Sequence, residues 1–171
     1  MKVSLRALSL MLLVILLGCG YRPVGTEPPA PQVAPTMAIP PFANRSTEIG
    51  LEAILANALI HAFSQTKAVR ITTRPQDADL VLEGKVQSVD NTSVAFQDIT
   101  RSTVRRVTLR IELGLRQGSG GKVIWKDNVI IQEDYVVDPN YAIGEATKAE
   151  GIRRAAITLA RRILDKVLLV I

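Results

Sequence analysis

The strongest constraint on the fold is a predicted strand from Val104 to Arg116, in which apolar residues occupy every second position from Val107 to Leu115. The apolar positions are Val107, Leu109, Ile111, Leu113 and Leu115. A period of two is typical of a β-strand with one buried and one solvated face. A Gly-rich stretch at 117–121 follows, and the alternation resumes from Lys122 to Tyr135. The pattern therefore predicts an antiparallel hairpin with a flexible loop.

The register of this hairpin follows from matching the apolar faces of its two strands. The predicted neighbours are Leu113 with Trp125 and Glu112 with Lys126. In this register Asp127 falls on the apolar face, opposite Ile111. We therefore expect a bulge or a frayed edge at Asp127.

Two segments have the spacing of amphipathic helices. The first runs from Glu48 to Ser64, and Ser46 or Thr47 is a candidate cap. The second runs from about Tyr141 to Val167, after the breaker Asp138-Pro139-Asn140. The buried stripe expected for this second helix is Ala149, Ile152, Ala156, Leu159, Ala160, Ile163 and Val167.

Two further strands complete the prediction. Residues 36–42 form a short strand, which Pro40-Pro41 limits to an edge or a strand end. A second strand begins at 78–86, and 91–101 is a polar connection. The order is thus β-α-β-β-β-α. The predicted fold is α+β, a two-layer sandwich with both helices on one face of a mixed four-stranded sheet.

The N-terminal segment has the organisation of a secretory signal peptide. Lys2 and Arg6 precede an apolar run, and Gly18 precedes the only cysteine, Cys19. This ending resembles a bacterial lipobox. We expect cleavage after residue 18 and an N-acyl, S-diacylglycerol lipid on Cys19, which holds the protein to a membrane. An uncleaved signal anchor, or a secreted protein with a chance cysteine, is the alternative.

Residues 19–35 then form a lipidated N-terminus and a Pro-rich linker, and 36–171 form the periplasmic domain. The single cysteine excludes a disulfide framework. Aromatic residues make up 4% of the chain, which argues against nucleic acid as a partner. The sequence has no Ser-His-Asp arrangement, metal-ligand cluster or phosphate loop. We therefore predict no catalytic residues, no metal and no cofactor besides the lipid on Cys19.

Three stretches carry a resemblance to a known family. They are Cys19-Gly20-Tyr21-Arg22-Pro23, then Ala38-Ile39-Pro40-Pro41-Phe42 with Asn44, and Ala78-Asp79-Leu80-Val81-Leu82-Glu83-Gly84. They resemble the LptE family of outer-membrane lipopolysaccharide-assembly lipoproteins, over nearly the whole mature chain. Lipoproteins that activate penicillin-binding proteins, and curli-secretion lipoproteins, carry motifs similar to the last two on a related core.

The resemblance implies a protein that plugs a large outer-membrane β-barrel, an LptD-like translocon, and assists insertion of lipopolysaccharide into the outer leaflet. The implied partners are the barrel, lipopolysaccharide and the membrane, which the lipid anchor contacts. The implied location is the periplasmic face of the outer membrane. Gly20 agrees with this location, because enteric-type lipoproteins that stay in the inner membrane usually carry Asp directly after the lipidated cysteine.

A periplasmic regulatory lipoprotein that activates a peptidoglycan synthase, or a curli-secretion-like lipoprotein, is the alternative function. A regulator that reaches through the periplasm needs a long spacer. The linker expected here ends by Pro35 and spans at most about 55 Å at about 3.1 Å per residue. This short linker favours the function of a translocon subunit over that of a periplasmic regulator.

The outward face of the predicted sheet supplies the candidate ligand site. Its cationic side chains are Lys85, Arg106, Arg110 and Lys126. Lipid A carries phosphates, and arginine binds phosphate with bidentate geometry. These four residues are our candidates for contact with lipopolysaccharide. A solvated sheet face with interspersed Glu83 and Glu112 is the alternative.

Overall fold

The structure is a computed structural model, and it describes residues 33–96 and 102–171. The predicted signal peptide, Cys19 and the linker up to residue 32 lie outside the described residues. Residues 34–171 form one compact unit. Its elements are β1 (Thr36–Ala38), β2 (Ala43–Asn44), α2 (Leu51–Ser64), β3 (Arg70–Thr72), the 3-10 turn η1 (Pro75–Asp77), β4 (Leu80–Phe96), β5 (Ser102–Gln117), β6 (Val123–Val136) and α3 (Tyr141–Leu168).

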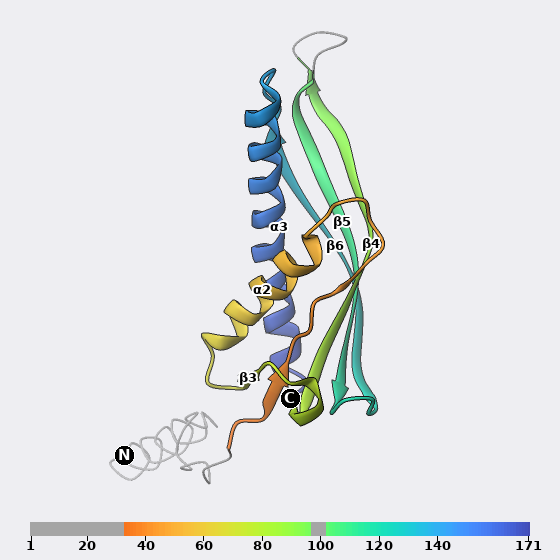
Figure 1. Cartoon of the computed structure of the whole chain (residues 1–171), viewed down its shortest axis with the longest axis vertical. Helices are drawn as coiled ribbons and strands as arrows, with labels where there is room; N and C mark the ends of the chain where they lie inside the picture. Colours follow the sequence, from red (N-terminus) through yellow and green to blue (C-terminus); the bar gives the residue numbers. More distant parts are fainter. Residues whose placement is uncertain (1–32, 97–101) are drawn as a thin grey trace, which may run out of the picture. The chain divides into compact units, whose positions relative to one another are not determined.

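The domain has two layers, a mixed sheet and two helices that cover one of its faces (Figure 1). The strand order is β3-β1-β4-β5-β6, and β2 also pairs with β4. The strands β4, β5 and β6 are antiparallel, whereas β1 pairs in parallel with β3 and β4. The predicted α+β sandwich is confirmed.

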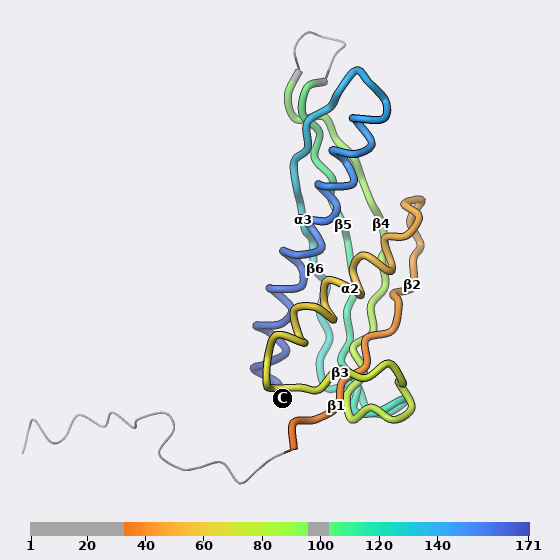
Figure 2. The backbone as a smooth tube through the Cα atoms, turned by 60° about the vertical axis from the view of Figure 1, so that its left-hand side comes forward, coloured from red at the N-terminus to blue at the C-terminus, as the bar shows by residue number. Residues whose placement is uncertain are grey.

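The sheet nevertheless has six strands and not four. The strand predicted at 36–42 ends early, because β1 stops at Ala38 before Pro40-Pro41, and proline has no N–H to donate to a neighbouring strand. A second short strand, β2, follows the prolines at Ala43–Asn44, where no strand was predicted. The short strand β3 adds the sixth, and it lies beside β1 at one end of the domain (Figure 2). These short strands depend on their partners and carry little periodicity of their own.

The predicted polar connection at 91–101 is wrong in its first half. Strand β4 continues to Phe96 and pairs with β5, for example Thr92 with Arg106. A register shift between Val86 and Ser88 leaves Gln87 as an extra residue. Such a bulge breaks the period of two, so the polar half of β4 does not continue the alternation from which the strand was predicted.

The predicted hairpin register is also wrong, by two residues. Leu115 is opposite Trp125, Leu113 is opposite Asp127, and Gly114 is opposite Lys126. A slip of two keeps every side chain on its face, so the apolar pattern could not detect it. The irregularity lies between Leu115 and Arg116 rather than at Asp127. Asp127 is instead accommodated by an ion pair with Lys166 of α3.

The core lies between the inner face of the sheet and the two helices. Leu109 and Ile111 are 0% and 2% exposed, as the alternation predicted. The stripe of α3 is buried as expected, except for Ala149, which is exposed. One turn before Ile152 the stripe instead passes through Lys148, whose Nζ lies 2.7 Å from Glu48 Oε2. Burial by itself would lower the pKa of Lys148, but the hydrogen bond and charge of Glu48 raise it overall.

Helix α2 begins at Leu51, three residues later than predicted. Neither Ser46 nor Thr47 caps it, because Gly50, at φ 83°, occupies the cap position. The amide nitrogen and hydroxyl of Ser46 both donate to Asn44 Oδ1, at 2.9 and 2.7 Å. Asn44 Nδ2 in turn donates to Glu52 Oε2 at 2.8 Å. This local network fixes the turn between β2 and α2.

Candidate functional site

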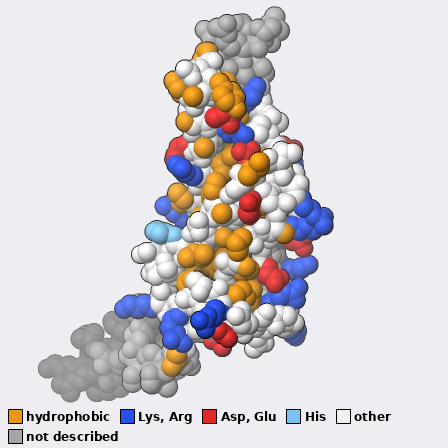
Figure 3. All heavy atoms as spheres, viewed as in Figure 1, with side chains coloured by type: hydrophobic (Ala, Val, Ile, Leu, Met, Phe, Trp, Pro, Cys, Tyr) orange, Lys and Arg blue, Asp and Glu red, His pale blue; other side chains and the backbone are white. Residues whose placement is uncertain are grey.

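The four predicted cationic residues all lie on the sheet face that the helices leave uncovered. They come from β4, β5 and β6, at positions that alternate with the core residues. Figure 3 shows Lys and Arg side chains along this side of the domain, with Asp and Glu among them. The prediction of a charged outer face therefore agrees with the structure, but the charges are of both signs.

Arg106 is held by a carboxylate on the neighbouring strand. Its Nε and Nη2 donate to Asp134 Oδ1 and Oδ2, at 2.6 and 2.9 Å. The hydrogen bond and the charge of this pair lower the pKa of Asp134 and raise that of Arg106. Both side chains remain partly exposed, at 40% and 45%. The two guanidinium nitrogens through which Arg106 could bind a ligand are thus already bound to Asp134.

Arg110 makes a similar pair with β4. Its Nη1 forms an ion pair with Asp90 and donates to Ser88 Oγ at 3.1 Å. Arg106 and Arg110 are four residues apart, which is about 13 Å along a strand. Thr108, only 6% exposed, lies between them and accepts a hydrogen bond from Gln132. The two arginines therefore do not converge on one point.

The two lysines both lie near Glu112. Lys126 Nζ is 3.2 Å from Glu112 Oε1, and Lys85 is the register partner of Glu112 on β4. The hydrogen bond and charge of Lys126, and less strongly the charge of Lys85, lower the pKa of Glu112. The outer face is therefore a row of ion pairs along β5, and not a bare cationic patch.

Sequence reasoning missed two of the anionic partners, Asp134 and Asp90, and one further cation. Arg116 Nε lies 2.9 Å from Glu83 Oε2, which extends the row. Asp134 is directly opposite Arg106 only in the observed register of β5 and β6. Asp90 reaches Arg110 only because β4 continues past the predicted strand end. The charged residues are thus evident in the sequence, but which of them form ion pairs follows only from the observed strand pairing.

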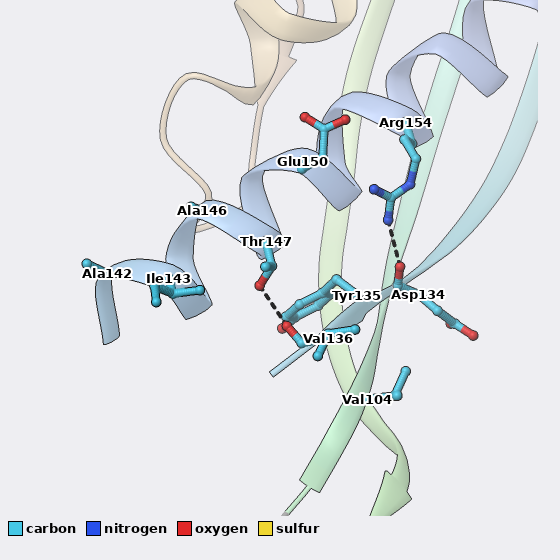
Figure 4. Close-up of a pocket in the computed structure, with 10 residues that line it drawn as sticks. All are labelled: Val104, Asp134, Tyr135, Val136, Ala142, Ile143, Ala146, Thr147, Glu150 and Arg154. Atoms are coloured by element: carbon cyan, nitrogen blue, oxygen red, sulfur yellow. Dashed lines mark hydrogen bonds between the residues drawn. The ribbon is translucent and has the colours of Figure 1, made fainter. Parts of the chain in front are cut away.

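A groove of about 590 Å³ lies where α3 begins beside the ends of β5 and β6 (Figure 4). It is lined mainly by apolar groups: Val104, Asp134, Tyr135, Val136, Ala142, Ile143, Ala146, Thr147, Glu150 and Arg154. Val136 and Ile143 remain 61% and 49% exposed. Hydrophobic side chains are visible at this end in Figure 3. The sequence signal was the apolar pair at Ala142-Ile143, which lies outside the buried stripe of α3.

Two hydrogen bonds join the walls of this groove. Thr147 Oγ1 donates to the carbonyl of Val136 at 2.6 Å, and Arg154 Nη2 donates to the carbonyl of Asp134 at 2.8 Å (Figure 4). They bind α3 to the edge of β6. The groove has the volume of a ligand pocket, and its chemistry suits an apolar group.

Other site classes have no support in the part of the chain that the structure describes. Residues 33–96 and 102–171 contain no cluster of three His, Cys, Asp or Glu side chains that could hold a metal. No helix in these ranges is both long and apolar enough to cross a bilayer. The candidate site therefore consists of the ion-paired face and the groove.

Comparison with protein families places the chain. The model of LptE, described as lipopolysaccharide-assembly, matches residues 34–167. The chain belongs to the LptE family. The family resemblance inferred from the three sequence motifs is thus confirmed, and this LptE-family protein is an outer-membrane lipoprotein of lipopolysaccharide assembly. A comparison with curated proteins found no match.

Solved structures similar to this LptE-family chain confirm its fold. A Xanthomonas campestris protein has a TM-score of 0.58 at 12% identity, with 84% of this chain and 90% of that chain covered. Rare lipoprotein B from Shewanella oneidensis has a TM-score of 0.51 at 15% identity, with coverage of 78% and 93%. A Chlamydia trachomatis protein has a TM-score of 0.54 at 10% identity, with coverage of 78% and 95%.

Proposed function

We propose that this LptE-family protein is the lipid-anchored subunit of a large outer-membrane β-barrel that translocates lipopolysaccharide. The lipid on Cys19 holds the protein at the periplasmic face, and the domain sits in the barrel as a plug. There it assists insertion of lipopolysaccharide into the outer leaflet as a binding subunit, without catalysis. The observation that carries the proposal is the family match over residues 34–167, which covers almost all of the folded domain.

The outer sheet face supports a position inside a barrel. The lumen of a membrane barrel is polar, and a surface that faces it must be polar as well. Here each of four cations on the face, Arg106, Arg110, Arg116 and Lys126, is paired with a carboxylate on an adjacent strand. Such a face can be enclosed at a smaller electrostatic cost than one with unpaired charges.

The same face also supports contact with lipopolysaccharide, because phosphate groups can replace the carboxylates that are paired with its arginines. An exposed ion pair contributes only about 0–1 kcal/mol. A phosphate offers more acceptor oxygens than a carboxylate and is bound well by arginine. We propose that phosphates displace Asp134 from Arg106 and Asp90 from Arg110, while Lys85 and Lys126 add positive charge nearby.

Purification of the tagged lipoprotein from outer membranes tests the barrel partnership. We expect an LptD-like barrel as the main co-purifying protein, in a ratio near one to one. An unrelated tagged lipoprotein of the same membrane is the control. A peptidoglycan synthase or a curli-type channel as the main partner would contradict the proposal and support the alternative.

Binding of purified lipopolysaccharide tests the role of the outer face. Reversal of both arginines, Arg106→Glu with Arg110→Glu, should weaken binding. Removal of their partners, Asp90→Asn with Asp134→Asn, should strengthen it, because the guanidinium groups become available. Both changes leave the core unaltered. If neither pair of changes alters binding at low and moderate salt, the face is an ordinary solvated surface.

A further inference from the structure

Strand β6 forms one edge of the sheet, and its backbone groups divide into two sets. Successive residues of an antiparallel strand direct their N–H and C=O groups to opposite sides. The amide of Val137 donates to Thr103, so the odd-numbered residues face β5. The carbonyls of Asp134 and Val136 are bound by α3, so the even-numbered residues face the open side.

At both ends of β6 the outward backbone groups are bound by α3 or the strand pairing is interrupted, but in the middle they are free of such contacts with the described part of the chain. Arg154 and Thr147 occupy the last two outward carbonyls. An extra residue, Ile124, interrupts the pairing at the other end. Between them, the outward backbone groups of Lys126, Asn128, Ile130 and Gln132 make no hydrogen bond to any described residue, and all four residues are exposed.

This open length is unusual because proteins commonly protect the edges of their sheets. The usual devices are short edge strands, proline, bulges or a covering helix. Here the 126–132 segment is about 23 Å long at about 3.3 Å per residue. Ile130, which is 54% exposed, lies near its centre. The edge therefore offers a template for one more strand.

Helix α3 supplies a positive charge beside the middle of this edge. Thr158 Oγ1 donates to Glu133 Oε1 at 3.2 Å, and Lys166 pairs with Asp127, so both residues reach β6. Arg162 is four residues from each of them and hence on the same side of the helix. Arg162 is exposed and forms no ion pair within the described residues. An acidic side chain on an added strand would complement it.

The apolar groove continues the edge where backbone pairing stops. Asp134 and Val136, whose carbonyls are occupied by α3, also line the groove. A chain that follows β6 toward this end can no longer add backbone hydrogen bonds, but it can place a side chain between Val136 and Ile143 (Figure 4). The edge and the groove together form one extended surface.

We propose that β6 takes up an extended segment of the barrel partner as an additional strand at residues 126–132. The segment is acidic where it passes Arg162 and apolar where it reaches the groove. Main-chain hydrogen bonds then supply affinity, and these two side-chain contacts supply specificity. This inference rests on the proposed barrel partnership and names the surface through which the two proteins are joined.

The test is retention of the lipoprotein by the co-expressed, affinity-tagged LptD-like barrel. Asn128→Pro removes one outward N–H and spares the bonds to β5, since proline is tolerated at a strand edge. Asn128→Thr is its matched control. Arg162→Glu removes the cation. Arg153→Glu makes the same charge change nine residues away, on the opposite side of the helix.

We expect Asn128→Pro and Arg162→Glu each to lower retention about tenfold, which corresponds to the loss of one good polar contact. Asn128→Thr and Arg153→Glu should bind like the parent. Circular-dichroism melting of each variant verifies that it folds. A photo-crosslinker at Ile130 should join the protein to an acidic segment of the barrel, and Arg162→Glu keeps the test valid if the proline variant does not fold.

The outcomes separate this inference from the proposed function. If the parent holds the barrel and both test variants hold it equally well, the edge is not the interface, and the barrel partnership stands. Crosslinks from Ile130 to a second copy, or to no protein in an intact complex, would also overturn the inference. If the parent does not hold the barrel at all, the proposed function fails and the inference fails with it.

Discussion

Gly84 explains at the residue scale why two of the sequence motifs occur together. The ring of Phe42, which is only 4% exposed, packs directly on the backbone of this glycine. A Cβ on Gly84 would lie 2.2 Å from Phe42 Cε2, well inside van der Waals contact. The motif that ends at Phe42 therefore meets the motif that ends at Gly84. Their combination reflects one packing contact in the core.

We predict that Gly84→Ala destabilises the domain by about 1–3 kcal/mol, as expected for an overpacked core. Gly114→Ala is the matched control on the adjacent strand, because its nearest contact would be Lys126 Cγ at an ordinary 3.8 Å. Urea unfolding of both variants measures the difference. Equal stability of the two variants would show that Phe42 moves aside without cost.

At the scale of elements, one polar contact holds β1 on β4. Asp79 Oδ2 accepts hydrogen bonds from the amide and the hydroxyl of Thr36, both at 2.8 Å. The amide of Asp79 donates to Thr36 Oγ1 at 2.9 Å. The backbone N–H of Thr36, followed by its hydroxyl, lowers the pKa of Asp79. This contact offsets the few backbone bonds that a three-residue strand can make.

The lowered pKa of Asp79 predicts a pH dependence of stability. A carboxyl whose pKa is lower in the folded chain than in the unfolded chain stabilises the fold at pH values above its unfolded pKa, which here is near 3.8. That contribution is lost as the pH falls through the lower folded pKa. The parent should therefore melt higher than Asp79→Asn at neutral pH, and the gap in melting temperature should narrow as the pH falls below 3.8. A gap in melting temperature that is independent of pH would contradict this assignment.

For the whole molecule, the decisive arrangement is a domain with one covered and one uncovered sheet face. The helices cover the apolar face (Figure 1), and the uncovered face carries the ion pairs. The unpaired edge of β6 and the groove lie beside α3. The candidate partner surfaces described above therefore lie along β4, β5 and β6.

We predict that Cys19 is the membrane anchor. Cys19→Ala should abolish metabolic labelling with a fatty acid and should stop signal-peptide processing, because no thiol remains to be acylated. The variant should also be lost from the outer-membrane fraction, since stable attachment needs more than one acyl chain. A matched Ser4→Ala change in the signal peptide should label normally. Fatty-acid labelling of the Cys19→Ala protein would refute the prediction.

The sequence by itself determined which face of β5 is buried and, apart from Ala149, the buried stripe of α3. The alternation around Leu109 and Ile111, and the helical spacing of residues such as Leu159, depend only on neighbours along the chain. The same holds for the signal-peptide pattern before Cys19. These local signals were enough for the α+β class, the order of the main elements and the family resemblance.

Only the tertiary structure decided how the strands pair. A slip of two residues preserves every face, so the sequence could not distinguish Trp125 opposite Leu113 from Trp125 opposite Leu115. Pairing placed Asp134 beside Arg106, and the extension of β4 past its bulge placed Asp90 beside Arg110. Within the described ranges, it also left β6 with no strand on its outer side. These features arise from contacts between residues far apart in the chain, which no local period encodes.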